Sequence, residues 1–174
     1  MPRNILQYDL LISCPDDIED EIEIINSVIQ EFNDMYSDLL EITVRTKHWN
    51  KNAYAKSGGR PQALLNNQFI SKCDAAIALL WTKFGTPTGM YGSGTEEEIE
   101  TMLASGKQVF MYFSDKALQP SKHNPVEYEK VRAFREKYKD KGMYFTYLTD
   151  EELRKYLLKH ISQYFIGEQQ AAKI

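Results

Sequence analysis

The residues best suited to chemistry lie in an acidic run at 96–98, directly after a Gly-Ser-Gly-Thr turn at 92–95. This pattern predicts a turn that meets a helix start, with the hydroxyl of Thr95 capping a first-turn amide. Glu98 stands three residues later, so its simplest interpretation is a capping box, in which its carboxylate reaches back to the cap. The alternative is that Glu98 faces whatever the glycine-rich loop encloses and acts as a catalytic carboxylate, with Glu97 as the competing residue.

Five short apolar runs surround this segment and must position it. They cover residues 8–14, 40–46, 75–81, 108–113 and 143–148, and segments with helical spacing separate them. Strands that alternate with helices predict a parallel sheet covered on both faces. We therefore expect a three-layer, flavodoxin-like α/β fold, with one domain over residues 1–166 and a frayed tail over 167–174.

The composition is that of a globular protein, with 43% hydrophobic residues, 26% charged residues and a formal net charge of -4. This balance argues against a dedicated nucleic-acid binder, which normally carries a basic stripe. The longest apolar run, 75–81, is too short to cross a bilayer, so we expect no membrane partner. Cys14 and Cys73 form neither a disulfide framework nor a metal-ligand spacing, and the three histidines are scattered. We expect no metal site, and two free thiols suit the reducing cytoplasm.

The glycine-rich stretch 85–94 matches neither of the common nucleotide-binding fingerprints. It lacks the Gly-x-Gly-x-x-Gly pattern of a Rossmann dehydrogenase and the Gly-Lys-Ser/Thr ending of a Walker loop. Both enzyme classes are therefore disfavoured. Loops at the carboxyl ends of parallel strands remain the expected place for a ligand.

Short motifs along the chain resemble, in their order and spacing, those of bacterial TIR-like domains, which share a superfamily with nucleoside 2-deoxyribosyltransferases. The resemblance runs from residue 10 to about residue 147. Its motifs are Leu11-Ile12-Ser13, Trp49, Gly59-x-Pro61-Gln62, Cys73-Asp74, Phe84-Gly85-Thr86-Pro87, Ser93-Gly94-Thr95-Glu96-Glu97-Glu98, Gly106-Lys107 and Tyr112-Phe113.

This resemblance implies an enzyme that cleaves the nicotinamide–ribose bond of NAD, with Glu98 as the catalytic glutamate. NAD would be the substrate, and no cofactor would be needed. The product would be ADP-ribose, cyclic ADP-ribose or a related ADP-ribosyl signal. Such bacterial domains typically serve antiphage defence, act as homo-oligomers once activated, and work with a partner effector or sensor protein.

The residues expected to bind the substrate come from the loops that follow the strands and from the helix start. Trp49 and Tyr54 are rings that can stack on a base, although packing over the sheet edge explains them equally well. The full set is Ser13, Cys14, Asp16, Trp49, Tyr54, Phe84, Gly85, Ser93 and Thr95.

Two other functions fit the same residues. One is a self-associating signalling module without enzymatic activity, and the other is a nucleoside 2-deoxyribosyltransferase or hydrolase. The deoxyribosyltransferases carry an aspartate six residues before their glutamate, where this chain has Gly92. Release of nicotinamide from NAD, release of free base from nucleosides, or neither, separates the three functions.

Overall fold

The computed structural model describes residues 1–48, 54–68 and 70–173, and the predicted pocket residue Trp49 lies outside these ranges. In the described part of the chain, five parallel strands form one sheet in the order β2-β1-β3-β4-β5. This is the flavodoxin-like order, which reverses direction between β1 and β3. The predicted fold class is therefore confirmed. The strands are β1 (Leu6–Ser13), β2 (Ile42–Lys47), β3 (Ala75–Leu80), β4 (Gln108–Ser114) and β5 (Tyr144–Tyr147).

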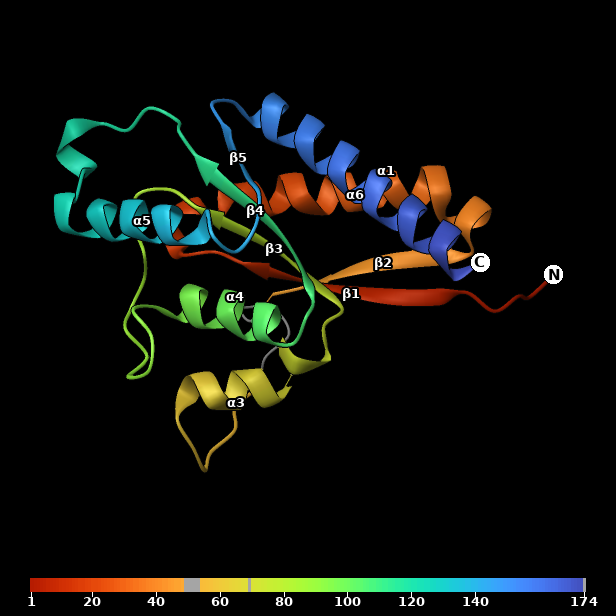
Figure 1. Cartoon of the computed structure of the whole chain (residues 1–174), viewed down its shortest axis with the longest axis horizontal. Helices are drawn as coiled ribbons and strands as arrows, with labels where there is room; N and C mark the ends of the chain where they lie inside the picture. Colours follow the sequence, from red (N-terminus) through yellow and green to blue (C-terminus); the bar gives the residue numbers. More distant parts are fainter. Residues whose placement is uncertain (49–53, 69, 174) are drawn as a thin grey trace.

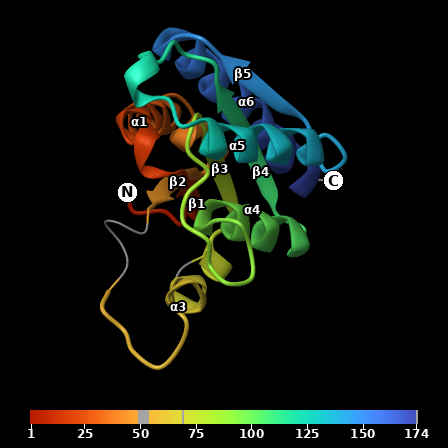
Figure 2. The same ribbon diagram turned by 90° about the vertical axis from the view of Figure 1, so that its left-hand side faces the viewer.

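Helices cover both faces of the sheet (Figure 1). α1 and α6 pack together on one face, and α3, α4 and α5 lie on the other. Figure 2 shows α4 and α5 on the same side of β3 and β4. The helices are α1 (Asp20–Leu40), α3 (Pro61–Gln68), α4 (Gly94–Ala104), α5 (Pro125–Tyr138) and α6 (Asp150–Ala172), with 3-10 turns at Asp16–Ile18, Ile70–Lys72 and Pro120–Lys122.

The two faces of the sheet have separate cores, because successive side chains of a strand point to opposite faces. Leu10 and Ile12 of β1 pack with α1 and α6, whereas Leu11 packs with Ile99 of α4. β3 is buried along its whole length, as expected of a central parallel strand. The buried β3 ends at Leu80, and the glycine-rich loop runs from there to the start of α4 at Gly94.

Several boundaries differ from the predicted ones, and two of the differences have a clear physical reason. α1 continues through Leu40, and Glu41 takes a left-handed conformation (φ 58°), so β2 begins at Ile42 rather than at Leu40. α6 continues through Ala172, past Gly167, and the expected frayed tail is corrected accordingly. Residues 168–172 read Glu-Gln-Gln-Ala-Ala, and these helix formers outweigh the cost of about 1 kcal/mol for one helical glycine.

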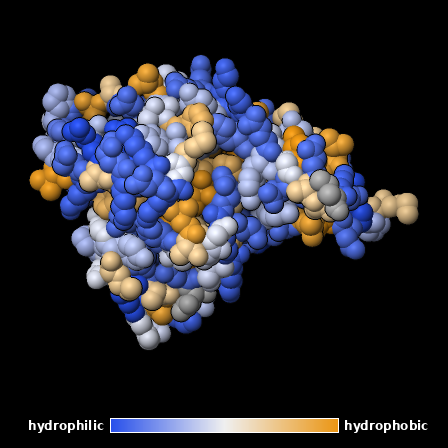
Figure 3. All heavy atoms as spheres, viewed as in Figure 1, coloured by the Kyte–Doolittle hydropathy of each residue, from blue (hydrophilic) through white to orange (hydrophobic). Residues whose placement is uncertain are grey.

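Exposed apolar side chains gather at the end of the molecule where both termini lie (Figure 3). Leu6 at the start of β1, and Met35 and Leu39 near the end of α1, are each more than half exposed. This end holds the amino ends of the strands, so it lies away from the edge at which parallel sheets bind ligands. Among the helices of the described residues, none has the length and apolar character needed to cross a bilayer.

Candidate functional site

A cavity of about 520 Å³ opens at the carboxyl ends of β1 and β3, where the strand order reverses. Open parallel sheets bind ligands at this position. The walls are the loop after β1, the start of α3, the loop after β3 and the first turn of α4. The lining residues are Cys14, Pro15, Asp16, Arg60, Pro61, Gln62, Leu65, Gly85, Thr86, Pro87, Thr88, Gly94, Thr95 and Glu98.

The first turn of α4 is capped by Ser93 and not, as the sequence predicts, by Thr95. Ser93 has an extended backbone, and its Oγ accepts a hydrogen bond of 3.1 Å from the amide of Glu96. The Glu96 carboxylate in turn accepts a hydrogen bond of 2.9 Å from the amide of Gly92. Ser93 therefore caps α4, and Glu96 reaches back to the amide one residue before the cap, next to the position that a capping box uses. The capping-box interpretation of Glu98 is wrong.

Glu98 points toward β1 instead of toward the cap. It is 5% exposed, and its Oε2 accepts a hydrogen bond from the hydroxyl of Ser13 at the end of β1. Gln62 at the start of α3 also hydrogen-bonds to the carboxylate. Burial raises the pKa of Glu98 to about 7, against the lowering effect of these two hydrogen bonds, and the charge of Glu97 adds to the rise. Because burial disfavours the charged form, Glu98 changes its charge near neutral pH.

Glu97 is buried as deeply but faces a different set of groups. Its two oxygens accept hydrogen bonds of 2.9 and 3.1 Å from the guanidinium of Arg60. Thr88 Oγ1 and Asn66 Nδ2 donate further hydrogen bonds of 2.8 and 3.1 Å. Burial by itself would raise the pKa of Glu97, but these donors outweigh it and hold the pKa below its ordinary value. Glu97 thus joins α4 to α3 and to the loop after β3, and it does not line the cavity.

The two remaining acids of α4 are paired with lysines. Glu100 lies 3.5 Å from Lys137 and also pairs with Lys141, and Glu96 lies 3.9 Å from Lys137. Within the described ranges, Glu98 is therefore the α4 carboxylate that has no cation at salt-bridge distance. A buried and perturbed carboxylate in a cleft is a candidate for chemistry.

Two other titratable residues line the cavity beside β1. Burial, with the charge of Glu98, raises the pKa of the Cys14 thiol to about 12. This thiol stays protonated at neutral pH, and the thiolate is the nucleophilic form of cysteine. The carboxylate of Asp16 is largely exposed and lies 3.6 Å from Lys83 Nζ. Glu98 is therefore the buried carboxylate of the cavity wall.

The structure brings five of the predicted substrate-binding residues to this region. Ser13 lies behind the cavity wall and reaches it through its hydrogen bond to Glu98. Contact of these residues with a substrate stays a prediction. Those on the wall itself are Cys14, Asp16, Gly85 and Thr95.

Besides Ser13, three described residues of the predicted set do not line the cavity. Phe84 is buried in the core, where its ring packs against Phe134 of α5 at a centroid distance of 5.6 Å. Tyr54 is 63% exposed, and its backbone pairs with the Gln68 side chain. Ser93 is fully buried and caps α4. The apolar ring and the capping hydroxyl thus stabilise the loop and helix that carry the site.

The sequence alone did not reveal the contribution of α3. Arg60 and Gln62 line the cavity, and this segment supplies partners to both Glu97 and Glu98. The available signal was the Gly-x-Pro-Gln motif at 59–62, whose proline begins the helix and is well suited to that position. Such a motif indicates a helix start. It does not predict that Arg60 and Gln62 contact Glu97 and Glu98, because those contacts depend on how α3 packs against α4.

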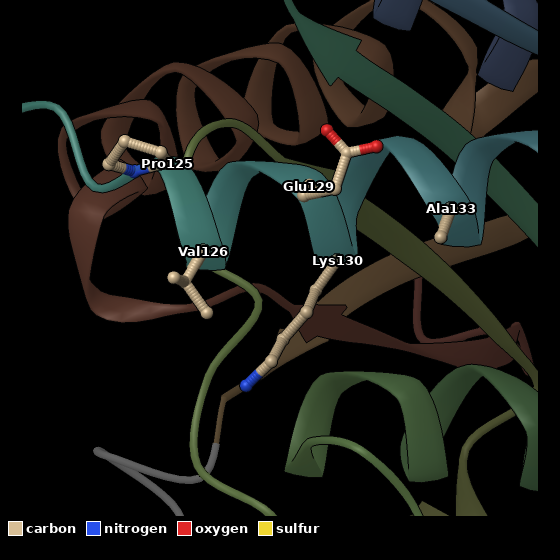
Figure 4. Close-up of a pocket in the computed structure, with 5 residues that line it drawn as sticks. All are labelled: Pro125, Val126, Glu129, Lys130 and Ala133. Carbon is tan, nitrogen blue, oxygen red and sulfur yellow. The ribbon is translucent and has the colours of Figure 1, made fainter.

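A second hollow, of about 570 Å³, lies along the amino-terminal half of α5 (Figure 4). Its described lining comes from this one helix. Figure 4 shows Glu129 pointing away from Val126 and Lys130, so the polar groups do not converge. Ligand sites combine concavity with convergent polar groups, and we therefore assign the candidate site to the cavity beside Glu98. The residues of this second hollow are Pro125, Val126, Glu129, Lys130 and Ala133.

Flavodoxin-like sheets can hold FMN at this switch point, but the loop after β1 does not suit a phosphate. The loop reads Pro15-Asp16-Asp17. Proline has no amide to donate, and two carboxylates repel a phosphate. Asp17 Oδ2 already accepts hydrogen bonds from the amides of Thr82 and Lys83. These residues do not fit FMN, and across the described residues no group of three His, Cys, Asp or Glu is placed to hold a metal ion.

The sheet and the cavity define the class of protein: a flavodoxin-like α/β domain with a buried carboxylate at its switch point. The family model described as "Domain of unknown function (DUF4062)" matches residues 13–162. This match covers most of the chain, and the chain therefore belongs to that family. Among curated proteins there is no match.

Three solved structures illustrate what the chain is similar to. A conserved protein from Enterococcus faecalis V583 is 15% identical, with a TM-score of 0.47 over 88% of this chain and 99% of that chain. Apo elongation factor SelB from Methanococcus maripaludis is 10% identical, with a TM-score of 0.46 over 92% of this chain and 36% of that chain. Oxidised flavodoxin 1 from Bacillus cereus is 14% identical, with a TM-score of 0.41 over 92% of this chain and 97% of that chain. These sequence identities and TM-scores are too low to indicate a function for this chain. The resemblance to TIR-like domains stays a prediction.

Proposed function

We propose that this protein cleaves the nicotinamide–ribose bond of NAD or a related nucleotide, with Glu98 as the catalytic carboxylate. The observation that carries the proposal is the setting of Glu98, which is buried, lines the switch-point cavity and has no cation at salt-bridge distance among the described residues. The other acids of α4 are paired with arginine or lysine. A free carboxylate in a cavity is what this chemistry requires.

The reaction builds positive charge on the ribose ring, in a transition state that resembles an oxocarbenium ion. An ionised carboxylate beside the anomeric carbon stabilises that charge. Nicotinamide leaves as a neutral base and takes the electron pair of the broken bond, so no general acid is needed. Water, or another hydroxyl group, then bonds to the anomeric carbon and loses its proton to the solvent. One carboxylate suffices, and the position of Glu98 on the cavity wall supports assigning it this role.

Ser13 and Gln62 hold the carboxylate of Glu98 from two different elements. Their hydrogen bonds orient it and favour its ionised form, whereas burial favours the protonated form. The balance is a pKa of about 7. Glu98 is therefore about half ionised at neutral pH, and both residues act by positioning it.

The test is release of nicotinamide from NAD by the purified chain. Protein concentration is varied because the TIR-like resemblance implies activation by assembly. Glu98→Gln keeps the size of the side chain and removes its charge, and we expect turnover to fall about 10³-fold. Glu100→Gln is the matched control, because it makes the same change on the same helix outside the cavity. Unchanged turnover in Glu98→Gln would remove this residue from the mechanism.

The same preparation separates the other two functions. Release of free base from nucleosides, without release of nicotinamide from NAD, indicates a deoxyribosyltransferase or hydrolase. Concentration-dependent oligomers that release neither product indicate a self-assembling signalling module. Both outcomes contradict the NAD-cleaving function.

We also propose the cytoplasm as the compartment. Cys14 and Cys73 are both free thiols, and reducing compartments maintain thiols in this state. Labelling of the unfolded chain, taken directly from cells, with a thiol reagent measures whether both remain reduced.

A further inference from the structure

We infer that the amino end of α4 is the phosphate-binding part of this cavity, and that the ligand is a phosphorylated nucleoside. This subsite rests on the proposed function for the identity of the substrate, because it assigns one part of the same pocket. Backbone amides, a side-chain hydroxyl and the orientation of the neighbouring acids define the subsite.

The first two amides of α4 have no acceptor among the described residues. Ser93 satisfies the next two, because its Oγ accepts from the Glu96 amide at 3.1 Å and its carbonyl accepts from the Glu97 amide at 3.0 Å. The amides of Gly94 and Thr95 precede this cap, and both residues line the cavity. Free amides at a helix start carry partial positive charge and bind anions.

The hydroxyl of Thr95 is a further, independent donor. Thr95 is only 7% exposed and lines the cavity, yet in the described chain its hydroxyl has no hydrogen-bond partner. The Thr95 hydroxyl is not among the fully buried polar atoms that lack a partner, so it is accessible from the cavity. Gly94 beside it has no side chain of its own, although the Gln62 side chain lies against it, and Gly94 and Thr95 line the same cavity.

The acids that could compensate the positive end of α4 are directed elsewhere. The Glu96 carboxylate accepts from the amide of Gly92, and the Glu97 carboxylate binds Arg60. Neither acid lines the cavity, whereas Arg60 does. Arg60 is therefore already paired with Glu97, and Asp16 and Glu98 are carboxylates of the same cavity. An external anion at the helix start would be held by the amides of Gly94 and Thr95 and by the Thr95 hydroxyl.

Thr95 and Glu98 share one face of α4, because residues three apart on a helix are neighbours, with roughly 5–6 Å between their Cβ atoms. This spacing is comparable to the distance across a ribose from its anomeric carbon to its 5′-phosphate. A nucleotide can therefore place its phosphate on Gly94 and Thr95 while its anomeric carbon meets Glu98. The acidic loop after β1 offers no second place for the phosphate.

The test measures binding to the full chain and needs no turnover. Ribose 5-phosphate and ribose are titrated separately, and their dissociation constants are measured by ligand-observed NMR. We expect ribose 5-phosphate to bind about tenfold or more tightly than ribose, and Thr95→Val to lose about tenfold of that preference. Thr95→Ser restores it. Thr101→Val is the matched control on the same helix, since that hydroxyl donates to the Glu97 carbonyl outside the cavity.

Equal binding of the two sugars, or an undiminished phosphate preference in a folded Thr95→Val, overturns the subsite. Equal turnover of nicotinamide riboside and nicotinamide mononucleotide overturns it as well, while the proposed function stands. Binding of ribose 5-phosphate through Thr95, without cleavage of any nicotinamide nucleotide, supports the subsite and contradicts the proposed function. Circular dichroism of each variant checks the fold.

Discussion

Glu97 and Glu98 follow one another on α4 and are both buried, but they meet different groups. Glu97 accepts hydrogen bonds from a guanidinium, a hydroxyl and an amide, and its pKa is lowered. Glu98 meets a hydroxyl and an amide, with no cation among the described residues, and burial raises its pKa to about 7. Successive residues of a helix point about 100° apart, so one turn presents one carboxylate to α3 and the other to the cavity.

The difference shows that pairing, rather than burial, separates a structural carboxylate from a candidate catalytic one. A paired buried carboxylate holds elements together, and removing it leaves its partners unsatisfied. An unpaired one destabilises the fold in its charged form, and such residues concentrate at functional sites. Substitutions at the two positions should therefore change stability in opposite directions.

The largest expected change in stability belongs to Glu98→Gln and depends on pH. The pKa of Glu98 in the folded state, about 7, lies above its ordinary 4.5. The wild-type protein therefore loses stability as pH rises through this interval, by about 3 kcal/mol in all. Urea denaturation should give equal free energies of unfolding near pH 4.5 and a variant more stable by about 3 kcal/mol near pH 8.5. A difference that does not vary with pH contradicts this account of Glu98.

Glu97→Ala should have the opposite effect at every pH above the pKa of Glu97. It leaves the guanidinium of Arg60 and the amide of Asn66 without their acceptor, and we expect a loss of about 2–3 kcal/mol. This loss is at the lower end of the range for breaking a buried ion pair, because Arg60 is partly exposed and solvent screens its charge. Glu100→Ala, whose lysine partners are more exposed, should cost less than about 1 kcal/mol in the same urea experiment. Equal losses in the two variants would remove the distinction between them.

The rate of nicotinamide release should rise with pH. Below a pKa of about 7 the ionised fraction of Glu98 falls about tenfold per pH unit, and the rate should follow it to a plateau above neutrality. Ser13→Ala removes a hydrogen bond that favours the ionised form, so the midpoint should move to higher pH. The pH profile of kcat/KM, which reports ionisations of the free enzyme, measures both. A midpoint near pH 4 would show that a carboxylate with an ordinary pKa controls the rate.

The smallest expected effect concerns the cap that sets the register of α4. Ser93→Ala removes the acceptor of the Glu96 amide and should cost about 1 kcal/mol. Thr95→Val removes a hydroxyl that has no partner in the described residues and should change stability by less than about 0.5 kcal/mol. Thermal unfolding of the two variants makes the comparison. If Thr95→Val lost about 1 kcal/mol and Ser93→Ala almost nothing, Thr95 would be the cap of α4 and Glu98 would belong to a capping box.

Local signals predicted much of the fold. Asn124 caps α5 and Pro125 is its first residue, and both are local signals because a cap and a first-turn proline act within one turn of helix. The uninterrupted apolar run after Asp74 likewise marked β3. Local signals failed where two neighbours satisfied the same rule, since Ser93 and Thr95 are both good caps and only one has the extended backbone of a cap.

The candidate site was predictable only in part, because its decisive contacts join distant segments. Arg60, Gln62 and Asn66 approach α4 from more than thirty positions earlier in the chain, as the separation of 37 residues between Arg60 and Glu97 illustrates. Phe84 lay in the right loop, but its ring packs into the core. Neither outcome follows from spacing along the chain.

By itself, the sequence determined an α/β fold and an acidic helix start after the central strand, because hydrophobic periodicity and turn residues act over a few neighbours. Tertiary structure alone decided which glutamate faces the cavity. The cation that neutralises Glu97 comes from the residue before α3, and the hydroxyl that holds Glu98 comes from the end of β1. Only folding brings these groups together, and the charge state of a buried carboxylate depends on the groups around it.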